Sequence, residues 1–143
     1  MRLPSACLLS SGIILFGVGS LEAQTVWQPL VTVGQTRIWA DSTSWARIAD
    51  NTWAVRLRTI EGRVDGKPST EASVHRMEFD CGLRTYRVRQ TSVERSGRII
   101  GVPLPDSLGS SNWASPQNEW LEDYMLRAVC ERAAKQMPSG SDT

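Results

Sequence analysis

Arginine is the residue of this 143-residue chain that is best suited, by type and spacing, to bind a partner. Among its 16 basic residues only Lys67 and Lys135 are lysines. The planar guanidinium group binds carboxylates, sulfates and phosphates through two parallel hydrogen bonds, which a lysine ammonium cannot do. The close series Arg84, Arg87 and Arg89 is therefore the candidate partner-binding site.

Three more arginines lie near this series if the predicted strands pair in sequence order: Arg56, Arg58 and Arg76. Such a sheet presents a basic patch for an anionic glycan or an acidic protein loop. The alternative is that the arginines pair across strands with the acidic residues of the sheet and serve only its stability. These acidic residues are Glu61, Glu78, Asp80 and Glu94.

Residues typical of catalysis are sparse. His75 is the only histidine, and alternation places it beside Met77 and Phe79, where a hydrogen-bonded sheet histidine is more common than a catalytic one. The sequence contains no hydrolase, phosphate-loop or metalloprotease motif and no cluster of cysteine and histidine at metal-ligand spacing. We therefore predict no catalytic, cofactor-binding or metal-binding residues. An enzyme or enzyme inhibitor is the competing class, and it requires an exposed cleft joining His75 to acidic residues.

Six tryptophans are many for a chain of this length. Trp27 and Trp53 occupy apolar-face positions of predicted strands, which indicates a structural role. Trp45 and Trp113 fall in predicted loops, where an aromatic side chain is also suited to contact a partner.

The first 23 residues have the order of an export signal. A short basic start is followed by an apolar run and then by Leu21, Glu22 and Ala23, after which we expect cleavage. An uncleaved anchor is the alternative, but polar residues interrupt the run, and a membrane span needs about 20 apolar residues. No cysteine stands at the expected cleavage point for lipid attachment, since Cys7 lies too early. We expect an exported protein, periplasmic or secreted to the cell surface, with no membrane span after cleavage.

Cys81 and Cys130 are the two cysteines of the expected mature chain, which runs from Gln24. An even pair in an exported chain favours a disulfide over a metal site, two separate buried thiols being the alternative. Closing a loop of roughly 50 residues should stabilise the fold by about 4 kcal/mol in the chain-entropy model. The length from 24 to 137 corresponds to one domain, followed by a disordered tail at 138–143.

Alternation of apolar and polar residues predicts about five to six strands. The expected strands span 27–33, 36–41, 52–61, 72–81, 83–94 and 98–104. A short turn is expected through Trp45 and Ile48, and a bulge or tight turn at Gly82. A helix is expected from the Ser115 N-cap and Pro116 to about Met137. The fold class is α+β, an antiparallel sheet with a C-terminal helix tied to it by the disulfide.

Three segments of the chain resemble the bacterial surface-adhesin protein E family. They are 38–42 (IWADS), 77–87 (MEFDCGLRTYR) and the late helix containing Val129 and Cys130. The resemblance implies an antiparallel sheet with a disulfide-tied helix, binding of extracellular-matrix and plasma proteins through basic residues of the sheet, and a homodimer. The adhesin that gives the family its name is lipid-anchored, whereas this chain has no lipidation cysteine at the expected position.

The function predicted from the sequence is a non-enzymatic, exported binding module of the bacterial envelope, without cofactor, for a protein or anionic glycan partner. A formal net charge of +1 argues against binding nucleic acid by bulk electrostatics. A structural protein of the envelope is a further alternative.

Overall fold

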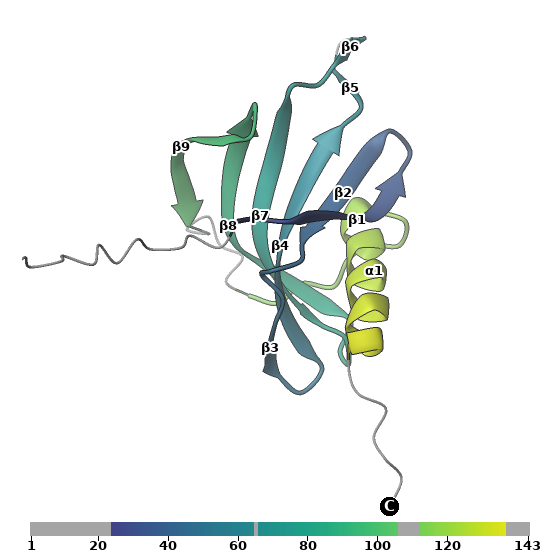
Figure 1. Cartoon of the computed structure of the whole chain (residues 1–143). Coiled ribbons are helices and arrows are strands. Elements are labelled where there is room, and N and C mark those ends of the chain that lie inside the picture. Colours follow the sequence, from purple (N-terminus) through teal and green to yellow (C-terminus); the bar gives the residue numbers. More distant parts are fainter. Residues whose placement is uncertain (1–23, 65, 106–111, 137–143) are drawn as a thin grey trace, which may run out of the picture.

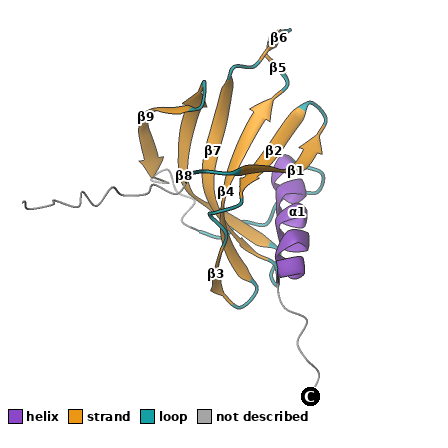
Figure 2. Ribbon diagram, viewed as in Figure 1, coloured by secondary structure: helices purple, strands orange, loops and turns teal. Residues whose placement is uncertain are grey.

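The computed structural model describes residues 24–64, 66–105 and 112–136. The expected signal segment and the expected tail at 138–143 lie outside these described residues. Figure 1 shows a curved sheet with a helix beside it, and Figure 2 shows the same view coloured by secondary structure.

The sheet is antiparallel throughout, and seven strands form it in the order β1-β2-β4-β7-β8-β9, with β3 paired to β4 outside this path. Strands β5 and β6 pair as a separate two-stranded sheet. The strands of the main sheet are β1 (Trp27–Val33), β2 (Thr36–Asp41), β3 (Ala46–Ala49), β4 (Thr52–Glu61), β7 (Glu71–Asp80), β8 (Thr85–Arg95) and β9 (Arg98–Pro105). The two-stranded sheet consists of β5 (Arg63–Val64) and β6 (Lys67–Pro68). The predicted α+β fold class is confirmed.

Helix α1 (Leu121–Gln136) covers one face of the sheet and forms the core with it. Its apolar residues Met125, Leu126 and Val129 are buried against strand residues that alternate with exposed ones, as a half-buried antiparallel sheet requires. The strand residues of this core are Ile38, Ala40, Val55, Leu57, Met77 and Phe79.

The disulfide between Cys81, directly after β7, and Cys130 on α1 joins two residues that lie 49 positions apart in sequence. The prediction that this bond ties helix to sheet is confirmed. The expected tight turn at Gly82 is also present, since a turn occupies 81–84 between β7 and β8.

Two local predictions are wrong. The segment expected as a short turn through Trp45 and Ile48 contains strand β3, because Ala46 and Arg47 pair with Ala54 and Trp53 of β4. The expected helix start at Ser115 and Pro116 is five residues too early. Glu119 has φ +64°, which a helix cannot include, so α1 begins at Leu121.

The start of α1 is fixed by Asp123, which is buried although it carries a charge. Its carboxylate accepts a hydrogen bond from the Glu119 backbone N–H at 3.3 Å and pairs with Arg127 and Arg84. Chiefly because Arg127 donates a hydrogen bond to it, the pKa of Asp123 lies below its usual range. A carboxylate in the first helical turn also interacts favourably with the helix dipole.

Among the described residues, no helix is long and apolar enough to span a membrane.

Candidate binding face

The face of the sheet opposite α1 gathers charged residues from three adjacent central strands. Strand pairing places Arg56 of β4 beside Arg76 of β7, and Arg76 beside Gln90 of β8. Because residues two positions apart in a strand point to the same face, Arg58 and Glu78 lie on this side too, and Arg87 joins them as the cross-strand partner of Glu78. We call the following set the arginine face: Asp41, Arg56, Arg58, Arg76, Glu78, Arg87, Arg89, Gln90 and Glu94.

A β-bulge enlarges this set. Arg76 pairs with Gln90, but the next residue Met77 pairs with Val88, so Arg89 is an extra residue in β8. Arg89 and Gln90 consequently line the same hollow although they are consecutive in sequence. Strict alternation would have placed them on opposite faces.

Most charges of the arginine face are paired. Arg58 forms an ion pair with the buried Glu94, and Arg56 lies 3.3 Å from a carboxylate oxygen of the buried Asp41. The guanidinium groups of Arg56 and Arg58 also lie over the Trp27 ring, at 5.5 and 5.9 Å from its centroid. These contacts stabilise the sheet and confirm part of the cross-strand pairing that the sequence suggested as an alternative.

Glu78 is shared between two arginines. Its Oε2 lies 2.5 Å from Nε of Arg87, and its Oε1 lies 3.6 Å from Nε of Arg89. The contact with Arg87 is a short, charge-assisted hydrogen bond, whereas the contact with Arg89 is a loose ion pair. Arg87 also packs its guanidinium 4.6 Å from the centroid of the Trp113 ring, a cation–π contact.

Arg76 differs from its neighbours. Its side chain is exposed, and among the described residues no carboxylate lies within ion-pair distance of it. The arginine face therefore holds five guanidinium groups against the carboxylates of Asp41, Glu78 and Glu94. The surplus positive charge lies at Arg76 and Arg89.

Three adjoining hollows mark this face, and Gln90 lines all of them. A hollow of about 460 Å³ is lined by Arg76, Glu78, Arg89 and Gln90. A second, of about 430 Å³, extends from these residues toward β3 and includes Asp41 and Ser44. The third reaches Thr25 and Trp27 at the start of β1 and Ser92 and Ile99 of β8 and β9. Because Thr25 and Trp27 line the third hollow together with Gln90 and Ser92 of β8, the start of β1 lies near β8, as in Figure 1. We call the three adjoining hollows the trough.

The three arginines predicted as the site do not all lie together. Arg87 and Arg89 lie together on Glu78, whereas Arg84 lies in the turn before β8 with φ +54° and pairs with Asp123 at 3.5 Å. Binding by Arg84, Arg87 and Arg89 remains a prediction, and the geometry adds Arg76 and Gln90 as neighbours of the latter two. Strand order had already indicated that Arg76 lies near this series. No sequence pattern indicated Gln90, because its position beside Arg89 depends on the bulge in β8.

His75 lies on the other, helix-covered face, between Leu57 and Thr91 of the neighbouring strands. Its Nδ1 is 3.0 Å from the Thr91 hydroxyl oxygen. Burial lowers the pKa of His75, and the negative charge of Glu122 opposes this shift only in part. His75 lines none of the three hollows of the arginine face.

The tryptophans differ in their exposure and in the residues that they contact. Trp53 is buried, and Trp45, expected in a loop, packs edge-on against it with ring centroids 6.3 Å apart. Trp113 is 38% exposed beside Arg87. Trp113 is thus the aromatic residue that adjoins the arginine face from the loop side.

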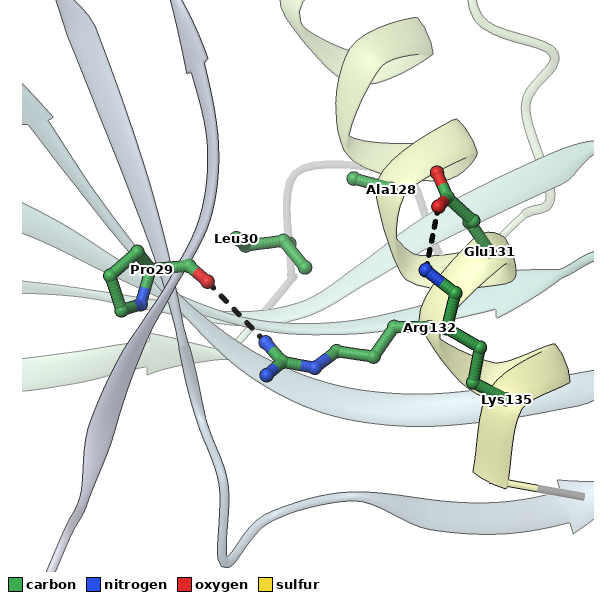
Figure 3. Close-up of a pocket in the computed structure, with 6 residues that line it drawn as sticks. All are labelled: Pro29, Leu30, Ala128, Glu131, Arg132 and Lys135. Atoms are coloured by element: carbon green, nitrogen blue, oxygen red, sulfur yellow. Dashed lines mark hydrogen bonds and ion pairs between the residues drawn. The ribbon is translucent and has the colours of Figure 1, made fainter.

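A fourth hollow, of about 310 Å³, lies between β1 and α1 (Figure 3). Arg132 donates hydrogen bonds to the Pro29 carbonyl oxygen at 3.4 Å and to the Gln28 side chain at 2.9 Å. Lys135 pairs with Glu131 at 2.8 Å. Both cations thus have partners within the chain, and this hollow is a weaker candidate for an anion than the arginine face.

Within the described ranges, no group of three or more potential ligand side chains is placed to hold a metal ion.

No protein-family model, curated protein or solved structure matches this chain. The resemblance to the surface-adhesin protein E family therefore stays a prediction from the sequence.

Proposed function

We propose that this protein is a non-enzymatic, exported binding module of the bacterial cell envelope, and that its arginine face binds an anionic group of a protein or glycan partner. The observation that carries the proposal is the surplus charge at Arg76 and Arg89 on the rim of one hollow. Among the described residues Arg76 has no carboxylate partner, and Arg89 has only the loose contact with Glu78 at 3.6 Å, so an anion that binds here breaks no close ion pair of the fold.

Export is supported by the disulfide, because such bonds persist in the periplasm and outside the cell and are rare in the cytosol. Fractionation of bacteria that express the full chain, with protease treatment of intact cells, tests the location. Protease-accessible protein supports binding at the cell surface, and periplasmic protein directs the search to envelope partners. Protein retained in the cytosol with free thiols contradicts the proposal.

Binding to surfaces coated with heparin, poly-glutamate or an extracellular-matrix protein tests the anion site. We expect the double substitution Arg76→Ala and Arg89→Ala to weaken binding at least tenfold, since each charge-assisted hydrogen bond contributes about 1.5–3 kcal/mol. The matched control is Arg47→Ala with Arg98→Ala, which removes the same charge from exposed positions outside the three hollows. Equal losses in the two double variants, or no binding to any anionic surface, would refute the proposed site.

The triple substitution of Arg84, Arg87 and Arg89 by Ala is less specific. It removes one of the two arginine partners of Asp123 and both arginine partners of Glu78 together with any binding groups, so the thermal stability of this variant must be measured alongside.

A further inference from the structure

The charged groups around the hollow of about 460 Å³ leave one position suited to an anion. Arg87 holds Glu78 at 2.5 Å, so this carboxylate is compensated before Arg89 approaches it at 3.6 Å. Arg76 lines the same hollow from the adjacent strand. A carboxylate or sulfate between Arg76 and Arg89 would face two guanidinium groups, while Glu78 remains bound to Arg87.

Gln90 supplies a different kind of group at the same place. It is half-buried, and among the described residues its side-chain amide has no hydrogen-bond partner. An amide offers both donors and an acceptor, and a sugar hydroxyl also needs both. Because Gln90 lines all three hollows, a ligand that extends along the trough passes it.

The geometry favours a glycan over an acidic peptide. Strands β4, β7 and β8 each have a paired strand on both sides, so their backbone groups cannot add a peptide as a further strand. Peptide and protein partners also depend on apolar anchors in pockets, but the hollow of about 460 Å³ between Arg76 and Arg89 is lined by polar residues alone. The apolar residues of the trough, such as Ile48 and Trp27, lie in the two adjoining hollows. Side-chain hydrogen bonding in the central polar hollow suits a hydroxylated, charged sugar unit.

We infer that the partner of this face is an anionic glycan, whose uronate or sulfate group binds between Arg76 and Arg89 and whose neighbouring hydroxyl binds the Gln90 amide. This inference rests on the proposed function, and it specifies the ligand class for the same site.

Titration calorimetry with three probes tests the inference: a heparin-derived octasaccharide, a poly-glutamate peptide of the same charge, and uncharged maltooctaose. We expect the octasaccharide to bind more tightly than the peptide and maltooctaose not to bind. Arg76→Ala and Arg89→Ala should each weaken octasaccharide binding about tenfold. Arg76→Lys, which keeps the charge but loses the planar fork, should restore only part of that loss.

The substitution Gln90→Ala distinguishes a glycan ligand from an acidic peptide ligand. It should weaken octasaccharide binding about threefold to tenfold, as expected for one neutral hydrogen bond, and leave any poly-glutamate binding unchanged. Because Arg76 and Arg89 are exposed and Gln90 is half-buried, the variants should fold, which their thermal unfolding will verify.

Two results overturn the inference in different ways. If poly-glutamate binds as tightly as the octasaccharide and depends on the same arginines, the ligand class is wrong and the proposed anion-binding function stands. If none of the probes binds the wild-type protein, the inference and the proposed anion site both fail.

Discussion

On strand β7, Met77 and Phe79 are 3% and 0% exposed beneath helix α1, whereas Arg76 and Glu78 on the opposite face line a polar hollow of the trough. The same four consecutive residues thus serve two surfaces of different chemistry. The helix-covered face is apolar and tied by a disulfide, whereas cross-strand ion pairs hold the residues of the arginine face together. Folding stability should therefore depend mainly on the first face, and binding on the second.

This separation has a physical cause. Burying apolar side chains contributes roughly 25 cal/mol per Å², while exposed ion pairs contribute about 0–1 kcal/mol each. Exposed arginines of the arginine face can accordingly change without unfolding the domain. The exceptions are ion pairs whose carboxylate is buried. Such a carboxylate is no longer hydrated, so removing its arginine partner destabilises the fold.

The largest expected effect lies on the helix-covered face. Replacing Cys81 and Cys130 together by Ser should lower the free energy of unfolding by about 4 kcal/mol, because the unfolded chain gains the entropy of an open loop. Denaturant unfolding measures the loss. Reductant should lower the unfolding midpoint of the wild type and leave that of the variant unchanged, and a wild type insensitive to reductant would contradict the prediction.

A smaller effect is expected on the arginine face at Glu94, whose side chain is 7% exposed and pairs with Arg58. Glu94→Gln should destabilise the fold by about 2 kcal/mol, because Arg58 then faces a neutral acceptor in a poorly solvated position. The control is Glu71→Gln, which removes the 46% exposed partner of Arg95 and should cost less than about 1 kcal/mol. Similar losses at both positions in thermal or denaturant unfolding would show that burial does not distinguish these pairs.

The smallest effect concerns pH and again the helix-covered face. Burial lowers the pKa of His75. Below about pH 6.5 the unfolded chain therefore binds a proton at His75 more readily than the folded protein does. The contribution of His75 to stability is full above that pH and is lost as the pH falls toward the folded pKa. His75→Gln keeps a hydrogen-bonding group opposite Thr91 but does not titrate.

Unfolding free energies of the wild type and the His75→Gln variant between about pH 5 and 7.5 test this prediction. We expect the wild type to lose more stability than the variant as the pH decreases. Parallel curves would mean that other groups, such as the carboxylates, account for the whole acid dependence.

The apolar alternation of the sequence was sufficient to predict six strands of the main sheet and the helix-covered core, because burial on one face imposes period two. Cys81 and Cys130 were predictable as a pair because the chain carries an export-like start and no metal motif. Strand β3 was missed because it is four residues long and exposed, so it has no apolar face to leave a pattern.

The candidate site was only partly predictable. Arg87 and Arg89 were identified from residue type, but their joint contact with Glu78 depends on the bulge in β8. Arg84 belongs to the turn, and its pairing with Asp123 depends on a helix start shifted by the positive φ of Glu119. Backbone irregularities of one residue decide these placements, and side-chain periodicity does not encode them.

The start of β1 has a practical consequence for experiments. Thr25 accepts a hydrogen bond from Arg56 at 2.7 Å, and with Trp27 it lines one end of the trough. Any fusion partner or affinity tag attached at residue 24 would sit at the trough mouth and compete with large ligands. Immobilisation at Gln136, the last residue of α1, keeps the attachment point on the helix-covered side, so the orientation on a sensor chip should itself change the measured binding capacity.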